Sequence, residues 1–165
     1  MNRLTDHFTE EEVFHSNTAD KLGINNHPDD GRVLQVLNRA HYLAANVLEP
    51  MRAWLCEYFG KDYALAVGSW HREPEVNTAV GSTSKNSLHL SNSGSAADVG
   101  KNVDSATLWA LFKWAAQNKE LPITELIFEE RPGNVFWIHA ACVEGNPKRA
   151  ISTTTDGRTY HPYQP

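Results

Sequence analysis

Cysteines are scarce in this chain of 165 residues, and the two that occur, Cys56 and Cys142, stand far apart. Neither has a second cysteine at the CxxC spacing, which disfavours a cysteine-based zinc site. We expect two buried thiols, because nothing in the spacing requires a disulfide. Long apolar runs are missing as well. No stretch approaches the ~20 residues that a membrane-spanning helix needs, so we expect no membrane insertion.

Positive charge is also in short supply. The chain has 15 Lys and Arg against 20 Asp and Glu, a formal net charge of −5, and no run of basic residues. Nucleic-acid-binding proteins usually present a basic face, so we expect no nucleic-acid partner. The first residues carry no basic-then-apolar leader pattern. We therefore expect synthesis in the cytoplasm without a signal peptide, so that any action outside it needs another route of export or release.

The composition that remains is that of an ordinary globular domain, with 41% hydrophobic and 21% charged residues. The length fits one domain, and we expect residues 1–165 to form it without an internal boundary. Helical periodicity is strongest over residues 33–48 and resumes over 51–59, with Pro50 expected to kink or interrupt the helix. A capping-box pattern at Thr9 and Glu12 predicts a short earlier helix. Further helices are expected over residues 74–80 and 105–118.

Short apolar runs predict strands over residues 63–67, 96–99, 126–128 and 135–143. The last two are separated by residues 131–134, a sequence typical of a hairpin turn. The segment 147–165 shows little periodicity, and we expect it to be an irregular C-terminal tail. These elements predict an α+β fold, in which N-terminal helices pack on a small, mainly antiparallel sheet.

Three residues have the chemistry of metal ligands. His89 lies in a loop rich in Ser and Asn, Asp98 follows two alanines, and His139 lies on the last predicted strand. Histidine and carboxylate suit zinc, and a catalytic zinc takes three protein ligands and leaves a fourth position open. Taken singly, each residue also fits an ordinary role, as a solvated loop histidine, a turn-capping aspartate or a hydrogen-bonded core histidine.

Several segments in order carry a more specific pattern. They are Ser87-Leu88-His89, Gly94-Ser95-Ala96-Ala97-Asp98, Trp137-Ile138-His139 and the upstream segments 47–52 and 68–81. Over roughly residues 5–143 the sequence resembles the zinc D-Ala-D-Ala carboxypeptidases and related phage endolysins. Their superfamily includes the zinc domain of hedgehog proteins.

This resemblance implies that the predicted sheet carries a Zn²⁺ site made by His89, Asp98 and His139. It also implies that Arg72 binds a substrate carboxylate or the developing oxyanion, through the two donors of a guanidinium. Ser87 would bind a ligand or the substrate. The ordinary alternatives are a surface salt bridge from Arg72 to Glu73 or Glu75, and a loop or cap hydroxyl at Ser87.

The sequence departs from the family pattern in three places. His89 and Asp98 are nine positions apart instead of the usual seven, which indicates a two-residue loop insertion near residues 92–93. Trp-His-Arg at residues 70–72 replaces Gly-Tyr-Arg. An acidic residue or histidine shortly before the last ligand is missing, so the catalytic proton acceptor must come from elsewhere.

We considered Glu129 and Glu130 as the nearest carboxylates for that role. A four-residue hairpin turn would place Glu130 on the sheet face of His139, whereas a five-residue turn would place Glu129 there. The resemblance aligns the family's L-I-W-E with residues 126–129 and favours Glu129. Two solvent-facing hairpin glutamates are the alternative, and His71 is the next candidate.

The sequence thus predicts a zinc metallopeptidase that hydrolyses an amide bond in peptidoglycan stem peptides. It would be a phage endolysin or a D-Ala-D-Ala carboxypeptidase-like enzyme, active as a monomer. It would act on the cell wall in the periplasm after release, or as part of a virion. One alternative is a zinc-binding structural or virion module with little or no catalysis, and another is an α+β binding domain without a metal.

Overall fold

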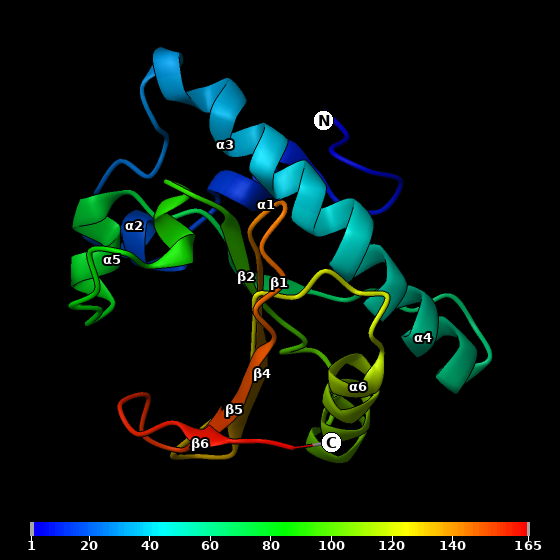
Figure 1. Ribbon diagram of the computed structural model, residues 1–165. Coiled ribbons are helices and arrows are strands. Elements are labelled where there is room, and N and C mark those ends of the chain that lie inside the picture. Colours follow the sequence, from blue (N-terminus) through cyan, green and yellow to red (C-terminus); the bar gives the residue numbers. More distant parts are fainter. Residues whose placement is uncertain (1, 165) are drawn as a thin grey trace.

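A six-stranded sheet forms the centre of the computed structural model, which describes residues 2–164 (Figure 1). Its strands run in the order β1-β2-β4-β3-β5-β6, and every neighbouring pair is antiparallel except the parallel pair β3–β5. The strands are β1 (Val67–Ser69), β2 (Ser95–Val99), β3 (Glu125–Arg131), β4 (Val135–Cys142), β5 (Ala150–Thr154) and β6 (His161–Pro162). The expected α+β fold with a mainly antiparallel sheet is confirmed.

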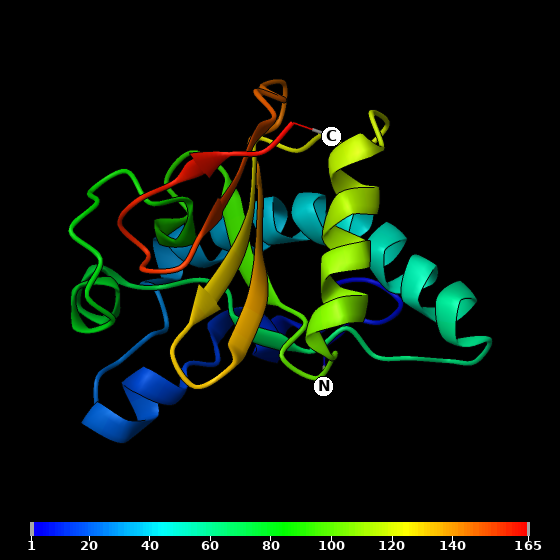
Figure 2. The same cartoon turned by 90° about the horizontal axis from the view of Figure 1, so that it is seen from below.

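Helices lie on both sides of this sheet. The long helix formed by α3, η1 and α4 lies with α6 on one side, and α2 and α5 lie on the other (Figures 1 and 2). The helices are α1 (Glu10–Phe14), α2 (Asn17–Leu22), α3 (Asp30–Leu43), π-helical η1 (Ala44–Leu48), α4 (Glu49–Phe59), α5 (Pro74–Ala79), 3₁₀-helical η2 (Leu88–Leu90) and α6 (Ser105–Gln117). Among residues 2–164, no helix combines the length and apolar character needed to cross a bilayer.

The strands β3 and β4 separate the core from a cleft by their alternating side chains. Leu126 and Phe128 on β3 and Ile138 on β4 belong to the hydrophobic core. The neighbouring residues Glu129 and His139 face the opposite side and line the cleft. Because successive strand residues point to opposite faces, one face of the sheet stabilises the fold while the other is available for chemistry.

Pro50 lies at the start of α4, and the irregularity expected there is a single π turn directly before it. In this turn Glu49 donates its backbone N–H to the carbonyl of Ala44, five residues back. Proline has no N–H to donate, so the regular α-helical hydrogen bond cannot form at residue 50. The wider turn accommodates the missing bond and the chain stays helical on both sides.

The expected strand over residues 63–67 begins later, as β1 at Val67. Two backbone groups of the preceding residues bond to a side chain, and the carbonyl of Ala66 accepts the N–H of Gly100, directly after β2, at 2.9 Å. Asn102 donates its Nδ2 to the carbonyl of Ala64 at 2.7 Å, and its Oδ1 accepts the N–H of Ala66 at 3.0 Å. A single asparagine therefore satisfies two backbone groups that a strand could have paired.

The expectation of an irregular tail over residues 147–165 is wrong, because this segment contains β5 and β6. Strand β5 extends the sheet by pairing in parallel with β3, from Glu125 opposite Ala150 to Glu129 opposite Thr154. Parallel pairing joins distant parts of the chain and leaves no turn signal in the sequence. The loop between β5 and β6 follows and becomes part of the wall of the cleft.

The close approach of β2 to β4 depends on Gly94. A Cβ at this position would overlap the carbonyl oxygen of Cys142 and would lie 2.7 Å from the Cγ2 of Val143. We predict that Gly94→Ala lowers the free energy of unfolding by roughly 1–3 kcal/mol, as expected for overpacking. Gly31→Ala in α3 is the matched control, because the atom nearest to a Cβ at this position is Asp29 Oδ1, at 3.4 Å. Denaturant unfolding that leaves both variants as stable as the parent would contradict this packing.

Candidate metal centre

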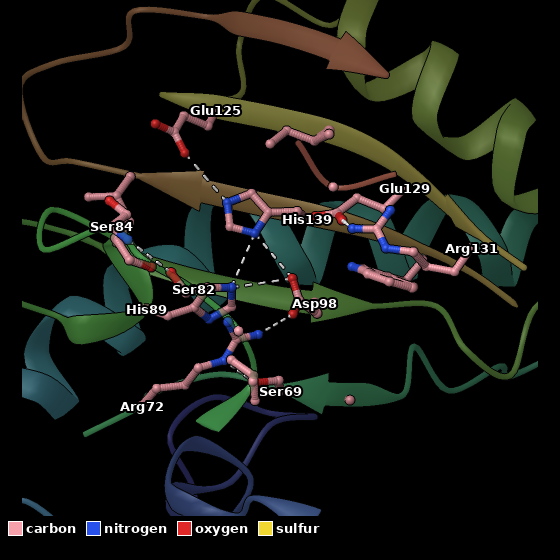
Figure 3. A pocket seen from close by; sticks show the side chains of 18 of the residues that line it. Ser69, Arg72, Ser82, Ser84, His89, Asp98, Glu125, Glu129, Arg131 and His139 are labelled. Atoms are coloured by element: carbon pink, nitrogen blue, oxygen red, sulfur yellow. Dashed lines mark hydrogen bonds and ion pairs between the residues drawn. The ribbon is translucent and has the colours of Figure 1, made fainter. Parts of the chain in front are cut away.

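Two neighbouring strands and one short helix bring the predicted ligands together. Asp98 on β2 is directly opposite His139 on β4 in the antiparallel register, so both side chains leave the same face of the sheet. His89 approaches them from η2, and the three side chains converge as shown in Figure 3. All three residues are buried. The sequence therefore identified a cluster whose members come from three separate elements.

The spacing of the ligand atoms fits a metal ion. Asp98 Oδ1 lies 3.1 Å from His139 Nδ1 and 3.3 Å from His89 Nε2, and the two imidazole nitrogens are 3.2 Å apart. Ligand atoms ~2.0 Å from a tetrahedral zinc ion are separated by about 3.3 Å, which matches this triangle. Two imidazoles and a carboxylate are also a ligand set that zinc accepts. The buried His89-Asp98-His139 group can therefore hold a metal ion.

Hydrogen bonds from outside the triangle orient two of these ligands. The Nδ1–H of His89 donates to the backbone carbonyl of Trp70 at 2.6 Å, which leaves the Nε2 lone pair directed at the site. Arg72 Nη2 donates to Asp98 Oδ2 at 2.6 Å, and its Nε donates to Ser69 Oγ at 2.9 Å. Such outer partners fix the tautomer and direction of metal ligands and raise their affinity for the metal.

A carboxylate that the sequence prediction did not include lies beside His139. Glu125 begins β3, and its Oε2 lies 3.5 Å from His139 Nε2 (Figure 3). This contact is within ion-pair range but too long for a good hydrogen bond, and among the described residues Nε2 has no hydrogen-bond partner. The sequence prediction names only Glu129 and Glu130 on this hairpin. Strand parity could have identified Glu125, because it lies four residues before Glu129 on the same face.

The electrostatics of the triangle favour a bound cation. Burial lowers the pKa of His89, which favours its neutral form. Burial alone would raise the pKa of Asp98, but His89 and His139 hold it well below its usual range. Burial also opposes protonation of His139, yet Asp98 and Glu125 outweigh it and raise its pKa to about 9. The cluster thus contains a charged carboxylate, and a bound metal ion would take the place of the proton that His139 carries.

The β3–β4 hairpin decides which candidate glutamate faces the site. Arg131 pairs with Val135, so the turn contains three residues, neither four nor five. Its odd length places Glu129 opposite Trp137, on the face of His139, whereas Glu130 pairs with Phe136 and is exposed. Glu129 is 8% exposed and contacts Arg131 Nη2 at 2.5 Å. Burial and the Asp98 carboxylate raise its pKa above the ordinary value.

The remaining candidates are placed differently. Arg72 lines the cleft but is bound to Asp98, and not to Glu73 or Glu75 as the surface alternative required. Ser87 lines the cleft directly before η2. His71 is fully buried, and its Nε2 lies 2.8 Å from Glu73 Oε1. His71 does not line the cleft, so the geometry does not favour it as a proton acceptor there.

The long spacing between His89 and Asp98 is accommodated by an ordered loop. Ser91 ends η2 in a left-handed conformation, with φ of 54°, and turns the chain toward β2. Its backbone carbonyl accepts a hydrogen bond from Arg39 of α3. Arg32, also on α3, donates to the carbonyl of Leu90 at 3.2 Å. Arg32 also donates to Asn92 Oδ1 at 3.3 Å, so the loop is held against α3 while His89 and Asp98 still converge.

The triangle opens into a cleft of about 1190 Å³. The cleft is lined by the loop over residues 80–88, by β3 and β4, and by the loop between β5 and β6. Ser82, Ser84 and Glu125 are among its polar side chains (Figure 3). The cleft is open on one side and large enough for several residues of an extended peptide.

Comparison with known proteins adds no assignment, because no protein-family model and no curated protein matches the chain. The metal centre therefore stands on its geometry alone.

We predict that the chain binds one zinc ion and that His139→Ala removes most of it. Loss of one of three protein ligands leaves an incomplete site, and even outer partners are worth roughly 10- to 100-fold in affinity. His41→Ala, at an exposed position on α3, is the matched control and should retain the metal. Zinc content by mass spectrometry and affinity by calorimetry measure both effects. Full occupancy of the His139→Ala protein would show that His139 is not a ligand.

Proposed function

We propose that this chain is a zinc-dependent peptidase that hydrolyses an amide bond in peptidoglycan stem peptides. The observation that carries the proposal is the buried triangle of His89, Asp98 and His139 at the floor of an open cleft. A carboxylate, Glu129, faces the same cleft. A three-ligand centre with an open side is the arrangement of catalytic zinc sites, whereas structural sites are closed by a fourth protein ligand.

Zinc is the metal that this ligand set favours, and when bound it would polarise a scissile carbonyl and activate a water molecule. The chain's own residues prepare the site for it. Arg72 fixes the direction of the Asp98 carboxylate through a hydrogen bond of 2.6 Å. Because Arg72 also lines the cleft, its guanidinium adds positive charge where a substrate carbonyl would develop negative charge.

Glu129 is the residue to which we assign proton transfer. It shares the face and cleft of His139, and its raised pKa brings it closer to the range useful for a general base near neutral pH. In this role it would accept a proton from the attacking water and return it to the leaving amine. Arg131 orients Glu129 from the end of β3, and Trp137 lies beneath the Arg131 guanidinium at 4.9 Å.

The substrate assignment rests on the cleft and on sequence resemblance. The cleft offers hydroxyl and amide side chains, including Ser82, Ser84 and Ser87, that could bind the backbone of a peptide. The motifs around the ligands resemble those of zinc D-Ala-D-Ala carboxypeptidases and phage endolysins. We therefore propose stem peptides as the substrate and the cell wall as the place of action. Release during phage lysis or delivery by a virion would bring a monomeric enzyme there.

A structural zinc module with little or no catalysis is the second candidate. It is favoured by the ion pair between Glu129 and Arg131, which occupies the carboxylate proposed as the base. It is also favoured by the lack of an acidic residue or histidine at residues 133–137, just before the last ligand. The two functions differ in one observable, the cleavage of peptidoglycan by the zinc-loaded protein.

We predict that Glu129→Gln lowers the rate of peptide cleavage roughly a hundredfold or more, in line with general acid–base contributions. Glu130→Gln is the matched control, because Glu130 carries the same charge one residue along but faces away from the cleft. Both variants should bind zinc as the parent does. Release of amino groups from peptidoglycan measures the rates.

A wild-type rate in the Glu129→Gln protein would exclude Glu129 as the base, and Glu125 would be the next carboxylate to test. A zinc-loaded parent protein that cleaves no peptidoglycan would refute the proposed peptidase and favour the structural module.

A further inference from the structure

Lys101 places an ammonium group at the border of the cleft. It follows β2 by two residues and lines the cleft together with Asp98 and His139. Its Nζ lies 5.6 Å from the centroid of the Trp137 ring, a distance at which a cation is attracted to an aromatic face. Trp137 is two residues before His139 on β4, so the lysine is held close to the metal centre.

The aliphatic part of Lys101 passes over Gly68 on β1. A Cβ at residue 68 would lie 2.8–2.9 Å from the Cε, Cδ and Nζ atoms of the lysine. The backbone of Gly68 is not in the left-handed conformation, so this position does not need glycine for its φ angle. Glycine matters here because the absence of a side chain leaves room for the stem of Lys101, and the ring of Trp137 attracts its ammonium group.

The charge of Lys101 is not neutralised within the protein. Of the other cations that line the cleft, Arg72 pairs with Asp98 and Arg131 pairs with Glu129. Lys101 has no carboxylate partner among residues 2–164, and neither has Arg158. Both side chains are exposed, but Arg158 lies on the loop between β5 and β6, whereas Lys101 is three residues from Asp98 and lies over the ring of Trp137. A cation held in place without an anion, beside a reactive centre, is suited to bind an anionic group of a ligand.

We propose that Lys101 recognises a carboxylate of the peptide substrate and thereby determines which peptides are cleaved. This inference rests on the proposed peptidase function. Two residues of a strand, the separation of Trp137 and His139, cover about 7 Å. A peptide bound at the metal centre covers a similar length with two residues, so the carboxylate lies within two residues of the bond that is cut. Arg72 is already paired with Asp98. We therefore assign the binding of the substrate carboxylate to Lys101.

Such a carboxylate has two chemical sources, the C-terminus of a peptide or the side branch of an acidic residue. The test therefore uses synthetic stem peptides in three forms. One has a free C-terminus and a free side-branch carboxylate, the second has only the C-terminus amidated, and the third has only the side branch amidated. For each protein, the ratio of kcat/KM between the free and the amidated peptide reports the recognition of that carboxylate.

The parent protein should prefer the free form over one of the two amidated forms by roughly 10- to 100-fold, the range of a charged hydrogen bond. Lys101→Met removes the charge but keeps a long apolar stem, and should bring this ratio close to one. Lys101→Arg should keep much of the preference. Gly68→Ala should also lower the ratio, because the new methyl group displaces the ammonium without removing it. Lys113→Met, at an exposed position on α6, is the control and should keep the parent ratio.

An unchanged ratio in Lys101→Met, or a parent protein without any preference, would overturn the inference while leaving the peptidase function intact. A zinc-loaded parent that cleaves none of the peptides would refute the peptidase function. In that case peptide binding, followed by nuclear magnetic resonance, still decides the role of Lys101. Tighter binding of a free carboxylate that depends on Lys101 would support the anion site, and binding that is indifferent to it would exclude the site.

Discussion

Asp98 carries a negative charge on a side chain that is only 7% exposed, and a charge withdrawn from water in this way needs compensating partners. The partners are the guanidinium of Arg72 on one oxygen and the two imidazoles of His89 and His139 on the other. The arrangement of the site depends on this carboxylate. It determines where the two histidines converge, it raises the pKa of His139, and it provides the charge that attracts a metal ion.

The sheet register converts this interaction into a functional site. Asp98, His139 and Ile127 lie side by side across three strands, with Glu125 and Glu129 two residues away on either side of Ile127. A slip of one residue between β3 and β4 would turn both glutamates into the core and expose Leu126 and Phe128. The hydrophobic pattern that specifies the core therefore also specifies which carboxylates face the metal centre. Packing and chemistry are determined by the same alternation of side chains.

Sequence patterns predicted correctly those helices and turns that are specified by residues close together in the chain. The capping box at Thr9, the helix α6 and the β3–β4 hairpin formed as expected, because a cap, a helical period and a turn each involve neighbouring residues. The sequence also predicted the three residues that can hold a metal ion, although only their combination in one pattern, and not any single residue, indicated them. That their ligand atoms converge in space is seen only in the structure.

The features that sequence reasoning missed depend on contacts between distant segments. Strand β5 exists because it pairs with β3, and residues 64–66 stay outside the sheet because Asn102 bonds their backbone. The contact of Glu125 with His139 follows from a turn of three residues, a length that the sequence did not specify. The ion pair that draws Arg72 to Asp98 spans 26 positions. None of these contacts leaves a periodic signal along the chain.

The most direct test of the account is a titration of the metal-free protein with zinc, in the presence of peptidoglycan, with zinc occupancy and released amino groups measured together. If His89, Asp98 and His139 hold a catalytic zinc ion, amino-group release should rise in proportion to occupancy and stop rising at one ion per chain. Full occupancy without release of amino groups would contradict the account, as would release that is independent of zinc.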